Sequence, residues 1–115
     1  MASYYRNLEV WKKAFELNRI VHDLLKKFPT DERFALTDQI RRATLSIPSN
    51  IAEWSGRWSD ADATRFFHIA KWSSMEVETQ LLLAREFSYV SQEELDNCLS
   101  LIDEIIRMIY GMIKK

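Results

Sequence analysis

Residues Arg41–Glu53 read RRATLSIPSNIAE, an amphipathic helical pattern that continues without interruption through Pro48. Proline inside a helix removes one backbone hydrogen bond and crowds the preceding turn, at a cost of about 3 kcal/mol or more. We therefore predict that this helix is bent at Pro48. The hydroxyl groups of Thr44, Ser46 and Ser49 are close enough in sequence to bond the backbone groups that such a bend frees.

Apolar residues on both sides of this stretch also recur at helical spacing. A first helix is predicted from about residue 8 until Pro29 stops it, and a second from residue 36 or 37 until Gly56 closes it. In the first helix the predicted inner face consists of Leu8, Trp11, Phe15, Val21, Leu24, Leu25 and Phe28.

Two pairs of residues have the spacing of a capping box, in which a serine and an acidic residue three positions later bond each other's backbone. Ser59 with Asp62 predicts the start of a third helix, and Ser91 with Glu94 predicts the start of a fourth. Four long amphipathic helices with short connections predict an all-α, antiparallel up-down four-helix bundle. Residues 1–115 are expected to form one domain.

The composition excludes several classes of protein. Two glycines and two prolines among 115 residues argue against a turn-rich β-sandwich or barrel. A single cysteine excludes an internal disulfide and suits a reducing compartment. No apolar run approaches the roughly 18 residues that a membrane span needs, and the N-terminus lacks the order of a signal peptide. We therefore expect a cytoplasmic protein that uses no membrane.

The sequence contains no recognisable catalytic or metal-binding constellation. A di-iron bundle needs Glu-x-x-His pairs, but the residues three positions before His22 and His68 are Arg19 and Arg65. Cys98 has no metal-ligand spacing to either histidine. There is no phosphate-cradling glycine loop and no nucleophile elbow. We expect a protein that is not an enzyme and needs no cofactor.

Three arginines are the better functional candidates: Arg41, Arg42 and Arg57. Cationic side chains can contact phosphates without any sequence preference, so this set predicts nucleic-acid binding. The net charge of −1 gives no long-range attraction to nucleic acid, so any binding has to come from a local patch. The alternative is that these arginines form salt bridges across a subunit boundary.

The chain closely resembles a known family in several segments. They are NLEVWKKA (7–14), IRRA (40–43), SIPSNIAE (46–53), RF (65–66), IA (69–70) and ETQLLLA (78–84). This is the four-helix-bundle family named for proteins encoded in intervening sequences of bacterial 23S ribosomal RNA genes, once labelled S23 ribosomal proteins. The family is similar to the accessory variability determinant of diversity-generating retroelements, a five-membered ring of bundles that binds RNA and reverse transcriptase. The resemblance implies a homopentamer and nucleic-acid binding.

The chain departs from the family pattern at three positions. Trp54 and Trp72 stand where glycine is usual, and Ala63 stands where a large apolar residue is usual. On a regular helix Trp58, Ile69 and Trp72 share a face opposite the predicted core. Large aromatic residues on an outer face are over-represented at interfaces. We therefore predict an oligomer or partner interface that contains Trp54, Trp58, Ile69 and Trp72.

Two interpretations of these tryptophans stay open. They can pack between neighbouring subunits of a ring or fill the space that Ala63 leaves. They can instead form a second surface, natural or engineered, that joins a second protein or another ring. We favour the second surface slightly.

The functional hypothesis that follows is a non-enzymatic, oligomeric helical-bundle protein that serves as a nucleic-acid-associated accessory platform for RNA or DNA. The alternative is an assembly or scaffold protein, with a tryptophan-rich interface and no nucleic-acid ligand.

Overall fold

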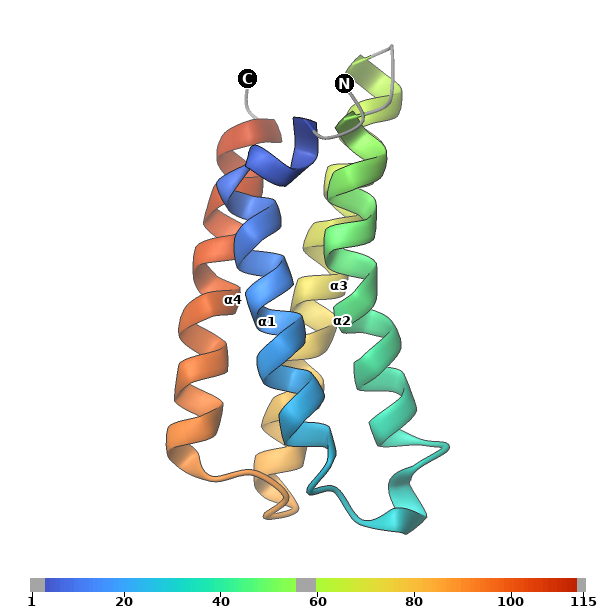
Figure 1. The fold of residues 1–115 in the computed structure, drawn as a ribbon, viewed down its shortest axis with the longest axis vertical. Coiled ribbons are helices and arrows are strands. Elements are labelled where there is room, and N and C mark those ends of the chain that lie inside the picture. The colour runs from blue at the N-terminus through green and yellow to red at the C-terminus, as the bar shows by residue number, and fades with distance from the viewer. Residues whose placement is uncertain (1–3, 56–59, 114–115) are drawn as a thin grey trace.

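The computed structural model describes residues 4–55 and 60–113. Four long helices fill most of these ranges: α1 (Glu9–Leu25), α2 (Leu36–Ser55), α3 (Asp60–Glu86) and α4 (Gln92–Ile113). Two short 3₁₀ helices, η1 (Tyr4–Asn7) and η2 (Thr30–Glu32), precede α1 and α2. No strand occurs within the two described ranges. Successive helices run in opposite directions (Figure 1), so the predicted all-α four-helix bundle is confirmed.

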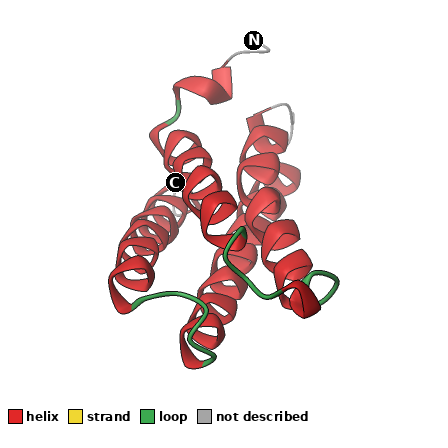
Figure 2. Cartoon of the chain, turned by 60° about the horizontal axis from the view of Figure 1, so that its bottom comes forward, coloured by secondary structure: helices red, strands yellow, loops and turns green. Residues whose placement is uncertain are grey.

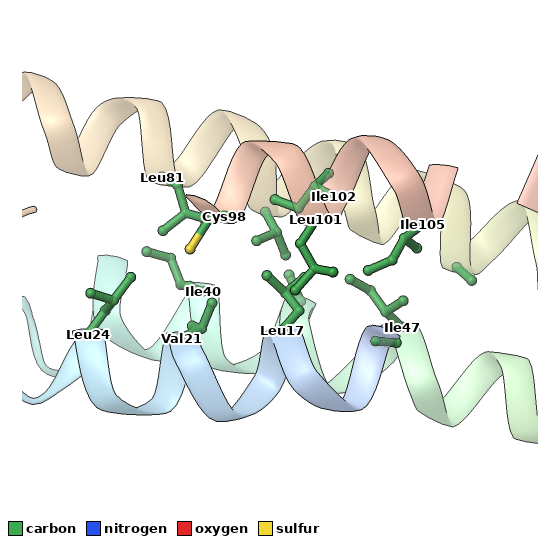
Figure 3. Close-up of a cluster of buried hydrophobic side chains, with 14 of the residues drawn as sticks. Leu17, Val21, Leu24, Ile40, Ile47, Leu81, Cys98, Leu101, Ile102 and Ile105 are labelled. Carbon is green, nitrogen blue, oxygen red and sulfur yellow. The ribbon is translucent and has the colours of Figure 1, made fainter. Parts of the chain in front are cut away.

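The helices surround one core in their order along the chain. Helix α1 contacts α2 and α4, and α3 contacts the same two helices from the far side. Aliphatic side chains from all four helices meet between them (Figure 3), among them Leu17, Ile40, Leu81 and Ile102. Each such side chain contributes roughly 1.5–3 kcal/mol when it is fully removed from water. None of the described helices combines the length and the apolar character that a bilayer span requires.

The most extensive helix contact joins α2 and α3, and small side chains allow it. Ala43 on α2 and Ala70 on α3 are buried, and the hydroxyl of Ser73 donates to the hydroxyl of Ser46 at 2.9 Å. Because these side chains are short, the two backbones can approach closely. The segment SIPSNIAE (46–53) therefore contributes to the most extensive helix–helix contact of the bundle, between α2 and α3.

Helix α2 continues through Pro48, and the carbonyl that the proline leaves without a donor is bonded from another helix. Pro48 has no N–H to offer the Thr44 oxygen one turn back. The side-chain amide of Asn18 on α1 donates to that oxygen at 2.9 Å and to the Ala14 oxygen at 2.8 Å. The hydroxyls of Thr44 and Ser49 bond carbonyls in their own turns instead. The bend at Pro48 stays a prediction.

The observed helix ends agree in part with the ends predicted from the sequence. The second helix starts at Leu36 as predicted, whereas the first ends at Leu25, before the apolar pattern does. At the fourth helix the predicted capping box is confirmed: the Ser91 N–H donates to Glu94 at 2.8 Å, and the Glu94 N–H donates to the Ser91 hydroxyl at 3.1 Å. Ser59, the serine of the other predicted box, lies outside the described residues.

The loops before α2 and before α4 lie at the same end of the bundle (Figure 2). The hydroxyl of Tyr89 in the second loop donates to the carboxylate of Glu32 in the first, at 2.8 Å. Lys27, after α1, pairs with Glu94 of the α4 cap. These contacts connect the C-terminal end of α1, the loop before α2 and the start of α4 at one end of the bundle.

Candidate binding surfaces on helices α1, α2 and α3

The predicted phosphate-contacting arginines of α2 are exposed and share one carboxylate. The Arg42 Nε lies 2.9 Å from Asp38 Oδ2, and the Arg41 Nη1 lies 3.7 Å from Asp38 Oδ1. Ion pairs between exposed side chains on one helix contribute only a few tenths of a kcal/mol, so a phosphate can replace Asp38 at small cost. Arg57 lies outside the described residues.

An apolar groove lies between α1 and α2, next to Arg41. Its larger part has a volume of about 560 Å³. A second hollow of about 300 Å³ adjoins it toward the N-terminal end of α1. Phe15, Asn18 and Leu45 line both, so the two hollows form one continuous groove. The whole groove is lined by Tyr5, Trp11, Phe15, Asn18, Arg19, Val21, His22, Asp23, Leu25, Arg41, Thr44, Leu45, Pro48, Ser49 and Ala52.

Two large apolar side chains in this groove are exposed to water. Phe15 is 47% exposed and Leu45 is 53% exposed. Phe15 lies on the stripe that the sequence predicts as the inner face of the first helix. It lies in the groove between α1 and α2 rather than in the core, because Leu17 and Val21 already fill the centre of the bundle. Periodicity located the apolar side of the helix but not the neighbour that would cover it.

A second apolar surface runs along the outward face of α3. It consists of Trp72, Met75, Leu82 and Leu83, all of them exposed, and is called the α3 stripe below. Trp72 is 58% exposed, and its ring stacks on His68 with 5.8 Å between the ring centroids. The stripe follows helical spacing, since residues 72, 75, 82 and 83 return to the same side after one and three turns.

The predicted tryptophan interface is divided between different environments. Trp54 is half-buried at the end of α2, where its ring stacks on Phe67 of α3 at 4.7 Å and packs against the core. Ile69 is also half-buried, and Trp72 alone of the described members is largely exposed. Trp58 lies outside the described residues. The sequence pattern did not separate Trp54 from Trp72, since the partner of Trp54 comes from another helix.

Side chains that can ligate a metal ion do not gather in the described part of the chain. Within residues 4–55 and 60–113 no three side chains of His, Cys, Asp and Glu gather closely enough to hold a metal ion. Burial raises the pKa of the Cys98 thiol to about 11, because the thiolate would lose its hydration in the core. Cys98 is fully buried in the hydrophobic core, where it packs as a small apolar residue.

Comparison with known proteins adds to this description. No curated protein matches the chain. One similar structure is the 1.70 Å crystal structure of a protein with unknown function from the S23 ribosomal protein family of Bacteroides thetaiotaomicron VPI-5482. It has a TM-score of 0.85 and 27% sequence identity, over 92% of this chain and 96% of that chain. Residues 6–111 match the family described as 23S rRNA-intervening sequence protein. The helical bundle and this match over nearly the whole chain agree with the family motifs, and the chain belongs to the 23S rRNA-intervening sequence protein family.

Proposed function

We propose that this protein is a non-enzymatic helical bundle that associates with copies of itself and presents arginine side chains to nucleic acid. The observation that carries self-association is the exposure of large apolar side chains on two surfaces, the α1–α2 groove and the α3 stripe. Contiguous apolar surfaces of this kind are uncommon on monomeric soluble proteins and mark interaction sites. Five copies is the number that the family resemblance implies.

Arg41 and Arg42 support the nucleic-acid part of the proposal. Both side chains of this α2 pair are at least half exposed, and together they carry more charge than Asp38 neutralises. In an oligomer the same pair repeats once in each subunit, so several weak phosphate contacts add together. This repetition compensates for a protein whose net charge is −1.

A titration of single-stranded RNA at low ionic strength tests this role. Arg42→Ala is expected to weaken binding measurably, since each oligomer loses one phosphate contact per subunit. The matched control is Arg107→Ala: Arg107 pairs with Asp103 one turn back on an exposed face of α4, as Arg42 pairs with Asp38. Equal losses in the two variants would mean that only general charge matters.

A scaffold without a nucleic-acid ligand is the second candidate. It is favoured by the single carboxylate that engages both arginines, as in a structural ion-pair cluster. A stable oligomer that does not bind RNA even at low ionic strength would establish the scaffold role and exclude the platform.

A further inference from the structure

The groove and the α3 stripe lie on different sides of the molecule. Helices α1 and α2 lie side by side toward the viewer in Figure 1, with α3 behind them. The groove opens between α1 and α2, while the stripe is on the side of α3 that faces away from the core. The two surfaces of one molecule therefore cannot cover each other, and each needs a second molecule.

The two surfaces match in shape and length. The groove is a concave surface between two helices, and the α3 stripe is the convex surface of a single helix. Recognition of an amphipathic helix by an apolar groove uses anchors three, four or seven residues apart, and Met75 follows Trp72 by three residues and precedes Leu82 by seven. From Trp72 to Leu83 the stripe is about 16 Å long, and the groove follows α1 from Trp11 to Leu25 for about 21 Å.

The charges at the two surfaces are complementary. Arg19 and Arg41 line the groove, which contains one acidic lining residue, Asp23. Glu76 and Glu86 lie exposed along the stripe on α3, whereas the one lysine beside it, Lys71, is half-buried over the Tyr110 ring. Opposite charges around an apolar contact select a partner and a register, and this pattern suits a helix with acidic flanks.

We infer that the α3 stripe of one copy lies in the α1–α2 groove of the next copy. This inference rests on the proposed self-association and states which surfaces make it. Because the two surfaces differ, the contact is heterologous: each copy that fills one groove leaves its own groove free for another. Such a contact produces a closed ring or a longer chain and does not stop at a two-fold dimer.

Cross-linking between two single-cysteine variants tests the pairing. Leu45→Cys places a thiol in the groove, and Leu82→Cys places one on the stripe; the native Cys98 is buried. With a short bismaleimide, a mixture of the two variants is expected to give cross-linked dimers, while either variant alone gives none. The double variant is expected to give a ladder that ends at the size of the oligomer. Ser100→Cys, exposed on α4, is the control that should not cross-link to either.

Charged substitutions supply a second measurement that does not depend on cross-linking. Leu45→Asp and Leu82→Asp are each expected to raise the dissociation constant of the oligomer about tenfold or more, as measured by light scattering against concentration. Phe34→Asp is the matched control, because Phe34 is 86% exposed in the turn before α2, outside both surfaces. Circular dichroism confirms that each variant keeps its helices.

The outcomes separate this inference from the proposed function. An oligomer in which Leu45→Cys links to itself, or in which neither thiol links, would overturn the pairing and leave self-association standing. A monomer at high concentration would overturn both. A monomer whose Leu45→Cys thiol is shielded from maleimide by RNA would assign the groove to nucleic acid instead.

Discussion

Pro48 and Asn18 act as one unit although thirty positions separate them. The proline removes the donor for the Thr44 carbonyl, and the amide of Asn18 replaces it from the neighbouring helix. The same amide also bonds Ala14 in its own helix, which fixes the side-chain direction. A bond that repairs α2 therefore also joins α1 to α2, beneath the groove that both helices line.

A double-mutant cycle on these two positions measures that coupling. Asn18→Ala leaves a part-buried carbonyl unbonded and is expected to lower the free energy of unfolding by about 1–3 kcal/mol. In a Pro48→Ala background the residue at position 48 regains its N–H and bonds Thr44 itself. Asn18→Ala should then cost about 1 kcal/mol less. Urea unfolding of the four proteins gives the coupling, and equal costs in both backgrounds would show that Asn18 acts elsewhere.

At the scale of the helices, α3 is followed by a serine in a backbone conformation that is unfavourable for any residue with a side chain. Ser88 has a φ of 66°, in the left-handed region. The Tyr89 N–H donates to the Ala84 oxygen at 2.8 Å and the Ser88 N–H to the Arg85 oxygen at 2.9 Å, which together make a Schellman motif. Glycine usually occupies this position because a side chain is strained there.

Ser88→Gly is accordingly expected to stabilise the protein by about 1 kcal/mol, since it relieves that strain while the two closing bonds remain. Thermal unfolding measures the gain. Ser100→Gly, at an exposed position inside α4 where glycine is unfavourable, should instead lose stability by a comparable amount. If Ser88→Gly also lowers the stability, the Ser88 hydroxyl stabilises the protein by more than the backbone strain at this position destabilises it.

The start of α4 gives a prediction for pH. The pKa of Glu94 is lowered, first by its hydrogen bond with Lys27 and then by the N–H of Ser91. A carboxylate with a lowered folded-state pKa contributes stability above its unfolded pKa and loses it as the pH falls through the folded value. Glu94→Gln should therefore destabilise the protein near pH 7 and much less near pH 3. Urea midpoints at the two pH values measure this, and a difference that stays constant would contradict the role of the charge.

The sequence predicts elements better than it predicts their partners. The Ser91 and Glu94 cap is visible in the sequence because a capping box involves only residues three apart. The closure at Ser88 is not, since no glycine marks it. The environments of Asn18 and Trp54 were harder to predict, because their partners, Thr44 and Phe67, come from other helices. Local spacing identifies the face of a helix but not what covers it.

At the scale of the whole molecule, the two proposed activities depend on different forces. The proposed contact between groove and stripe would be mainly apolar, since Leu45 and Trp72 are large apolar side chains exposed on the two surfaces. Apolar association weakens little when salt is added. Contacts of arginine side chains with phosphates, as proposed for α2, release counterions and weaken steeply with salt.

Ionic strength should therefore separate assembly from RNA binding in one protein. Between low and moderate salt, the mass of the oligomer is expected to stay constant while the affinity for single-stranded RNA falls. For a single strand, each phosphate contact contributes about 0.7 to the slope of log affinity against log salt. Arg42→Ala, a change outside the groove, should then reduce that slope by about 0.7 for each subunit engaged and leave the mass of the oligomer unchanged. If the oligomer dissociates with salt in parallel with the RNA, charge rather than apolar contact holds the subunits together, and the arginines belong to the subunit boundary.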